Sequence, residues 1–302
     1  MPIDLRPYES SHLEAWRALL AEPSIAPQFE VFLGANGLEH KLADSHLPSD
    51  TIRLAFDGET LVGFGFSWLL GSGEAPWAMM RVAVHPSHRR RGIGTAIVNS
   101  VLSTVASRGK MEKMGSLWLP SDEGEAFASS LSFEHERWFW MMERPRGAVP
   151  EPTWPDGITL RVFDRSEEMI RDWNDSHNGS FIDHWRYVAS TIDDARRIVS
   201  SPEFPADGLA VAYRGSEPVG FCRCELYPAR GEIGVLGTTR AARGIGLGRA
   251  LLRWGVAWLE ANSQAPVTLI VDGENERALS LYRSEGFDIT RTRRVLKRAA
   301  AD

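Results

Sequence analysis

Two glycine-rich turns have the residue types and spacing that most directly predict chemistry. They read Arg89-x-x-Gly92-x-Gly94 and Arg243-x-x-Gly246-x-Gly248, and each lies between an apolar strand and an amphipathic helix. Glycines let the backbone approach a ligand closely, and the free N–H groups at a helix start form an anion site. The two turns therefore predict binding of a phosphate, and above all a pyrophosphate, with a purely structural turn as the alternative.

Other phosphate-binding motifs fit this sequence poorly. A dinucleotide fingerprint needs a further glycine where Ile97 and Arg249 stand, and the Gly-Lys-Ser/Thr of a P-loop is absent from both turns. The 34 basic and 40 acidic residues give a net charge of −6, which argues against a nucleic-acid partner. The basic run His88–Arg91 lies on the first turn, so the phosphates of a small ligand explain it better than a nucleic acid does.

The two turns belong to a longer internal repeat. Arg89 and Arg243 are 154 positions apart, and so are Phe133 and Phe287, each of which follows a small residue. Matching landmarks in the same order predict a tandem duplication. We expect one domain over residues 1–147 and a second over residues 156–302, joined by a proline-rich, extended segment.

The hydrophobic pattern predicts the elements that must position each turn. In the second copy, Leu209–Tyr213 and Val219–Leu226 form a hairpin, residues 193–200 are helical, and the apolar run Val267–Val271 is a buried strand. Asn275 then caps a further helix. The fold class is α+β, with each domain a mixed, mainly antiparallel sheet flanked by helices.

Composition limits the class of protein. The chain has 302 residues, of which 43% are hydrophobic and 25% charged, and only two are cysteines, so a disulfide-stapled secreted scaffold is excluded. The start of the sequence is polar, and no apolar run reaches the roughly 18–20 residues of a membrane helix. We therefore expect a cytoplasmic protein without a membrane partner.

The two turns, together with the segment Asn275-x-x-Ala278-x-x-Leu281-Tyr282-x-x-x-Gly286-Phe287, resemble the two signatures of the GNAT (GCN5-related) N-acetyltransferases. With the repeat, the resemblance covers nearly the whole chain and extends to the tandem GNAT enzymes of the mycothiol-synthase type. It implies acetyl-CoA as co-substrate and no metal.

The resemblance also implies the residues that bind acetyl-CoA. In the second copy these are the strand end beside pantetheine, the turn around the pyrophosphate and the helix cap: Leu236, Gly237, Thr238, Arg243, Gly244, Ile245, Gly246, Leu247, Gly248, Arg249 and Asn275. In the first copy they are Val82, Ala83, Val84, Arg89, Arg90, Arg91, Gly92, Ile93, Gly94 and Thr95.

Two side chains match the catalytic pair of the family. Glu232 corresponds to the general base, acting directly or through water, and Tyr282 to the tyrosine that protonates the coenzyme A thiolate. The structural alternatives are a glutamate at an exposed strand start and a tyrosine packed on a helix. The first copy has Ala78 and Ala128 at the positions 154 residues earlier. We therefore expect the first domain to retain an acetyl-CoA site without catalysing transfer.

The implied acceptor is the primary amine of a small polar molecule bound between the domains, with the cysteinyl precursor of mycothiol as the leading candidate. The second half lacks the His-Pro-Glu-like segment expected of mycothiol synthases, the nearest stretches being at His177 and His184. An amine-bearing antibiotic or a natural-product intermediate, a protein N-terminus or lysine, and a non-catalytic acyl-CoA-binding protein stay open.

Two further residue groups are interpreted from their positions in the sequence. Cys222 and Cys224 point to the same side of a strand and lack further zinc ligands at suitable spacing, so buried, reduced thiols are expected. His177 and His184 lie in a loop-like stretch, where they could line a substrate pocket or cap the surface.

Overall fold

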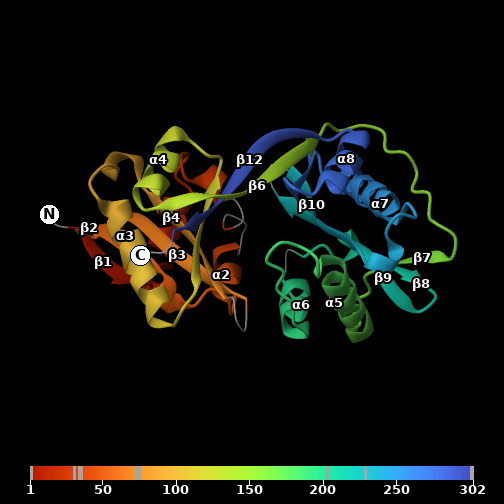
Figure 1. Cartoon of the computed structure of the whole chain (residues 1–302), viewed down its shortest axis with the longest axis horizontal. Helices are drawn as coiled ribbons and strands as arrows, with labels where there is room; N and C mark the ends of the chain where they lie inside the picture. Colours follow the sequence, from red (N-terminus) through yellow and green to blue (C-terminus); the bar gives the residue numbers. More distant parts are fainter. Residues whose placement is uncertain are drawn as a thin grey trace. The chain divides into compact units, whose positions relative to one another are not determined.

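The computed structural model describes residues 3–29, 32, 37–71, 76–201, 204–227 and 230–299. The chain divides into two compact units (Figure 1). Unit 1 comprises residues 1–139 and 292–302, and unit 2 comprises residues 140–291. No described helix is long and apolar enough to span a lipid bilayer.

Unit 1 contains five strands and four α-helices that lie wholly within it among the described residues: β1 (Asp4–Pro7), α1 (Leu13–Leu20), α2 (Gly37–Leu42), β2 (Arg53–Asp57), β3 (Thr60–Leu70), β4 (Trp77–Val84), α3 (Ile93–Ser107), β5 (Glu112–Trp118) and α4 (Asp122–Ser130). Unit 2 repeats this series: β7 (Ile158–Val162), α5 (Glu167–Phe181), α6 (Ile192–Val199), β8 (Leu209–Arg214), β9 (Glu217–Tyr227), β10 (Arg230–Thr238), α7 (Leu247–Asn262), β11 (Val267–Asp272) and α8 (Glu276–Ser284).

Two long strands, β6 (Phe133–Arg144) and β12 (Asp288–Arg298), each contribute to both units. In unit 1 the strand order is β1-β2-β3-β4-β5-β12-β6, and in unit 2 it is β7-β8-β9-β10-β11-β6-β12. Residues Arg293–Lys297 of β12 pair antiparallel with β5. The units therefore differ from the predicted ranges 1–147 and 156–302, because the last strands of the two repeats are exchanged and cover the edges of β5 and β11.

Each sheet is mixed, which confirms the predicted α+β class. Neighbouring strands run antiparallel from β1 to β4 and from β7 to β10, whereas β4 and β5, like β10 and β11, run parallel. The predicted hairpin, buried strand and capped helix of the second copy are β8–β9, β11 and α8. Residues 145–157 contain no helix or strand.

Helices cover both faces of each sheet. In unit 1, α1 contributes Trp16 to an aromatic cluster with Phe64 and Phe66, while α3 packs Ile97 and Val101 on the other face. In unit 2, α5 and α6 cover one face and α7 and α8 cover the other (Figure 1). Fully burying each large apolar side chain contributes roughly 1.5–3 kcal/mol, so these clusters stabilise the strands and helices that flank each glycine turn.

Candidate active site

The glycine turn of unit 2 joins the end of β10 to the start of α7. Gly244 and Gly246 have φ angles of +86° and +94°, and Gly246 is the N-cap of α7. A Cβ atom at either position would meet no atom within 4 Å, so this backbone is open to a ligand. The first turn of α7 leaves N–H groups without intrahelical partners. This geometry is suited to a phosphate group.

Carboxylates hold the arginine side chains around this turn. Arg243 Nη1 lies 3.1 Å from Asp183 Oδ2, and Arg243 Nη2 donates to the Ser180 carbonyl at 3.0 Å. Arg249 pairs with Glu285. The hydrogen bond from Arg240 is the main reason that the pKa of Asp183 falls to about 2. Because carboxylates already pair with these guanidinium groups, the backbone N–H groups of the turn are the better placed donors for the predicted phosphate.

Strands β10 and β11 separate before β10 ends. Their pairing covers Gly231–Ile233 and Val267–Leu269, and the register of β10 then shifts between Ile233 and Val235. Beyond this bulge, Leu236, Gly237 and Thr238 pair only with β9 among the described residues. The side of β10 that faces β11 thus offers unpaired backbone groups at the predicted pantetheine strand.

Glu232 lies just before the bulge and is only 8% exposed. Arg230 Nε donates to its Oε2 at 2.8 Å, and no described residue donates to its Oε1. Burial is the main cause that raises the pKa of Glu232, with a contribution from Glu225, against the lowering effect of Arg230. A carboxylate with a raised pKa is a stronger proton acceptor, so Glu232 has the properties of a general base.

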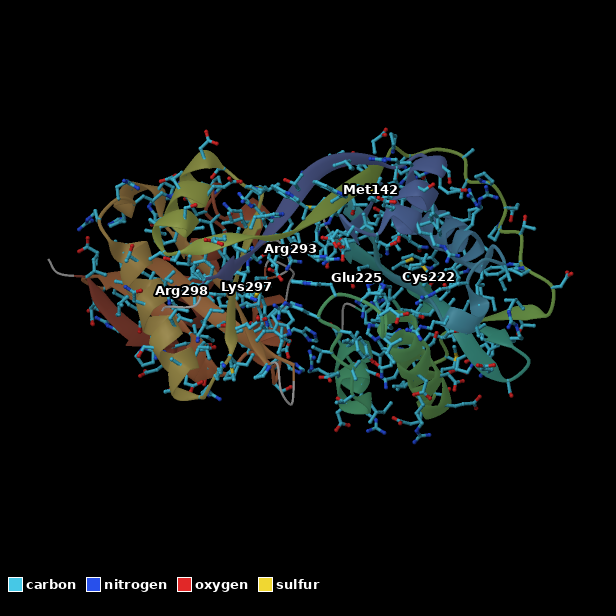
Figure 2. All side chains as sticks on the ribbon, in the orientation of Figure 1. Met142, Cys222, Glu225, Arg293, Lys297 and Arg298 are labelled. Atoms are coloured by element: carbon cyan, nitrogen blue, oxygen red, sulfur yellow. The ribbon has the colours of Figure 1, made fainter. Side chains whose placement is uncertain are left out.

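A second carboxylate, Glu225 (labelled in Figure 2), lies on the neighbouring strand β9. In the strand register Glu225 is directly opposite Glu232. Arg223 Nη2 and the Tyr227 hydroxyl donate to its two oxygens at 2.6 and 2.5 Å. Its side chain also lies against Gly234, where an added Cβ would collide with the carboxylate. Sequence reasoning missed these residues, although the period-2 alternation of Arg223, Glu225 and Tyr227 places all three on one face of a strand.

Tyr282 reaches the sheet from α8, on the opposite face to Glu232. It is 8% exposed and packs in the cluster that contains Cys222, Ile233 and Phe287. Burial raises the pKa of its phenol, with a smaller contribution from Cys222, so the hydroxyl keeps its proton at neutral pH. Asn275 caps α8, because its Oδ1 accepts from the Ala278 N–H at 3.1 Å.

The cysteines and His177 of unit 2, which were also considered from the sequence, are part of the packed interior of the unit. Cys222 and Cys224 are buried free thiols on the α7 face of β9. His177 lies inside α5 rather than in the expected loop, because Ser166 caps this helix and its apolar face continues to Phe181. Burial lowers the pKa of His177. Among the described residues, no group of three or more His, Cys, Asp or Glu side chains could hold a metal ion.

Unit 1 has the same turn and the same strand separation. Gly92, at φ +77°, is the N-cap of α3, and β4 pairs with β5 only as far as Met80. A cavity of about 400 Å³ lies at this separation; among the predicted positions its walls include Val82, Ala83, Val84, Arg89, Arg90, Gly92, Ile93, Gly94 and Thr95. Arg91 does not line the cavity; its Nη1 lies 3.3 Å from Asp57 Oδ2.

The carboxylates of unit 2 have no counterparts in unit 1. Met79, opposite Trp68, takes the place of Glu232 opposite Glu225. The constant spacing of 154 pointed to Ala78 instead, but the bulge adds one residue to β10 and moves the correspondence by one position. Ala128, at the spacing of Tyr282, is buried on α4.

Residues 13–126 and 166–287 both match the model of the acetyltransferase (GNAT) family. The chain belongs to this family. GNAT acetyltransferases use acetyl-CoA, and this chain is accordingly an N-acetyltransferase.

Curated relatives resemble the chain over most of its length. It is 33% identical over 240 residues to the mycothiol acetyltransferase of Frankia casuarinae, covering 74% of this chain and 68% of that protein. The mycothiol acetyltransferase of Salinispora arenicola is 33% identical over 262 residues, covering 82% and 81%.

Solved GNAT structures share the fold of the whole chain. A tandem GNAT protein from the clavulanic acid biosynthesis pathway superposes with a TM-score of 0.75 at 16% identity, covering 100% of both chains. A GCN5-related N-acetyltransferase from Sphaerobacter thermophilus gives 0.72 at 20% identity, covering 99% of this chain and 97% of that one.

Proposed function

We propose that this N-acetyltransferase transfers the acetyl group of acetyl-CoA to the primary amine of a small polar molecule, and that unit 2 carries the reaction. One observation carries the proposal. The gap between β10 and β11 has a buried carboxylate of raised pKa on one face of the sheet, a buried neutral tyrosine on the other, and the glycine turn at its end.

The site residues have distinct roles in this proposal. The turn from Arg243 to Arg249 holds the pyrophosphate through backbone N–H groups, and Leu236–Thr238 lies along pantetheine. An N–H group of this strand segment donates to the thioester oxygen, where negative charge develops during transfer. Bound acetyl-CoA supplies the activated acetyl group.

The two residues that transfer protons in this proposal lie on opposite faces of the sheet. Glu232 accepts the proton that the amine loses as the new C–N bond forms, directly or through water. Tyr282 donates its phenolic proton to the sulfur as the C–S bond breaks. Because the two residues approach from opposite faces, the acceptor amine enters on the α5 side and the thiol leaves toward α8.

Polar side chains of α5 lie buried on the side of β10 that carries Glu232. The Ser176 and Ser180 hydroxyls and Nδ1 of His177 are buried without a hydrogen-bond partner in the described structure. Ser180 packs so closely on Gly237 that an added Cβ would lie 2.6 Å from the Ser180 Cβ.

The names of the relatives support one particular acceptor. Proteins called mycothiol acetyltransferases match this chain at 33% identity. We therefore infer that the cysteinyl precursor of mycothiol is the first amine to test. For unit 1 we propose that the turn and cavity bind a coenzyme A ester without transfer, since Met79 cannot act as a base.

The direct test is release of free thiol from acetyl-CoA over a panel of primary amines that includes this precursor. Wild type and Tyr282→Phe are compared, with Tyr213→Phe as a control, because Tyr213 is a buried tyrosine whose hydroxyl bonds to Asp172 at 2.7 Å. Turnover with one small polar amine that falls only in Tyr282→Phe supports the proposal. Binding of acetyl-CoA without turnover on any amine would favour a binding protein, and equal rates would reject Tyr282 as the acid.

A further inference from the structure

A buried guanidinium group lies where the strands of unit 1 separate. Met80 forms the last pair between β4 and β5, and Arg81 is the next residue. Arg81 is only 5% exposed. The corresponding residue of unit 2, the first past the bulge of β10, is the apolar Val235. The two units thus differ in charge at the position where the two strands begin to separate.

No carboxylate of the described residues neutralises Arg81. Its Nη2 donates to the Gln28 carbonyl, its guanidinium carbon lies 4.0 Å from the Phe29 ring centre, and its Nε is buried without a partner. Leaving a buried charge unpaired is costly, and stacking on aromatic rings recovers only part of that cost. The site therefore favours an anion supplied by a ligand.

A second cation strengthens this preference. Arg293 of β12 (labelled in Figure 2) has its guanidinium carbon 5.0 Å from the Trp118 ring centre. The guanidinium carbon of Arg81 lies 5.5 Å from the centre of the same ring. Arg293 Nε donates to the Ser116 hydroxyl at 2.9 Å. Burial and then the charge of Arg293 lower the pKa of Arg81. An anion between these groups would relieve their repulsion.

Two neighbouring cavities lie between this charge and the glycine turn. Arg81 and Ser116 line an inner cavity of about 60 Å³. The inner and the 400 Å³ cavities share Phe29, Val82 and Leu117 among their walls, and the larger one extends to Gly92 and Gly94. A ligand with phosphates on the turn would therefore place its opposite end near Arg81. The inner volume is about that of two water molecules, which limits the end group to a few atoms.

We propose that unit 1 binds a coenzyme A thioester whose short acyl chain ends in a carboxylate, with that carboxylate on Arg81. The inference rests on the proposed binding of a coenzyme A ester by unit 1, and it names the acyl group. The glycine turn already accounts for the phosphate end of the ligand, so the anion at Arg81 belongs to the acyl end. Unit 2, with Val235 at this position, has no such preference.

The test compares thioesters of equal chain length by isothermal titration calorimetry on the full chain. Succinyl-CoA and butyryl-CoA differ mainly in a terminal carboxylate against a methyl group, and acetyl-CoA serves as the reference. Gly92→Val and Gly246→Val each disturb one glycine turn, so they assign the two binding steps to the units. We expect the unit 1 step to favour succinyl-CoA over butyryl-CoA by about tenfold or more, the range of a charge-assisted hydrogen bond.

Arg81→Met should abolish this preference while leaving acetyl-CoA binding in both units, and Val235→Met is the matched control in unit 2. Arg293→Gln, at a partly exposed position, should reduce the preference and provides a second variant if Arg81→Met does not fold. Equal affinity of unit 1 for succinyl-CoA and butyryl-CoA would overturn this inference and leave coenzyme A binding intact. Failure of unit 1 to bind any of the three esters would overturn both.

Discussion

The two units place different chemistry on the same scaffold. Around the strand gap, unit 2 has Glu232 opposite Glu225, where unit 1 has Met79 opposite Trp68. The next residue along the strand on the same face of the sheet is Val235 in unit 2, past the bulge, and the buried Arg81 in unit 1. The glycine turn and the separated strands are common to both. The two units thus share the framework proposed to bind the ligand, whereas the proposed proton-transfer groups, Glu232 and Tyr282, lie in unit 2.

The largest expected effect is on turnover. Glu232→Gln keeps the size of the side chain but removes the proposed base, and Tyr282→Phe removes only the proposed acid hydroxyl. Each should lower kcat by about 100-fold or more, the usual contribution of a positioned acid or base. Steady-state thiol release measures this, and near wild-type rates in either variant would remove that residue from the mechanism.

The second expected effect is on the pH profile. The ionised form of Glu232 is the active one, so kcat/KM should fall as the pH decreases through its raised pKa. Glu225→Gln removes a like charge and leaves Arg223 nearby unpaired, and both changes lower the pKa of Glu232. The acid limb of the profile should therefore move to lower pH.

A matched control for this shift is Glu260→Gln, which removes a carboxylate 3.0 Å from Arg144 and should leave the acid limb in place. An unchanged limb in Glu225→Gln would mean that Glu225 only supports the structure.

A smaller effect concerns how each helix packs on its sheet. In unit 2, a Cβ at Gly255 of α7 would lie 2.6 Å from Cys222 Sγ and 2.7 Å from Ile233 Cδ1. In unit 1 the glycine is on the strand instead, where Gly65 makes room for Ile97 of α3.

Gly255→Ala should therefore lower the free energy of unfolding by about 1–2 kcal/mol, because overpacking exceeds the gain in helix propensity. Adding Cys222→Gly, which imitates unit 1, should restore part of the loss. Chemical denaturation measures both variants, and stabilisation by Gly255→Ala alone would refute this packing account.

Local features of the fold could be predicted from the sequence because they depend on neighbouring residues. The hairpin of β8 and β9, the α8 cap at Asn275 and both glycine turns follow from short patterns. The exchange of β6 and β12 could not be predicted, because residues such as Arg293 and Trp118 pair across more than 170 positions. Strand pairing at that separation has no local signal.

The candidate site could likewise be predicted only in part from the sequence. The turns and the positions of Glu232 and Tyr282 follow from motif resemblance, whereas their roles stay predictions. The position of Glu225 opposite Glu232 depends on the register of β9 against β10. The bulge at Gly234 lies against Glu225 of the neighbouring strand. Neither feature can be predicted from the sequence of one strand alone. Arg81 likewise becomes a candidate anion-binding residue only because it is buried beside Phe29 and Trp118, which the sequence does not show.

The central claim is that unit 2 transfers the acetyl group and unit 1 does not. The most direct measurement compares acetyl-CoA-dependent thiol release in Gly246→Val and Gly92→Val. Valine is strained at the left-handed φ angles that Gly92 and Gly246 already adopt, so each substitution disturbs one turn. We predict that turnover is lost in Gly246→Val and largely retained in Gly92→Val, with both proteins folded by circular dichroism. Loss of turnover in Gly92→Val with retention in Gly246→Val would contradict the account.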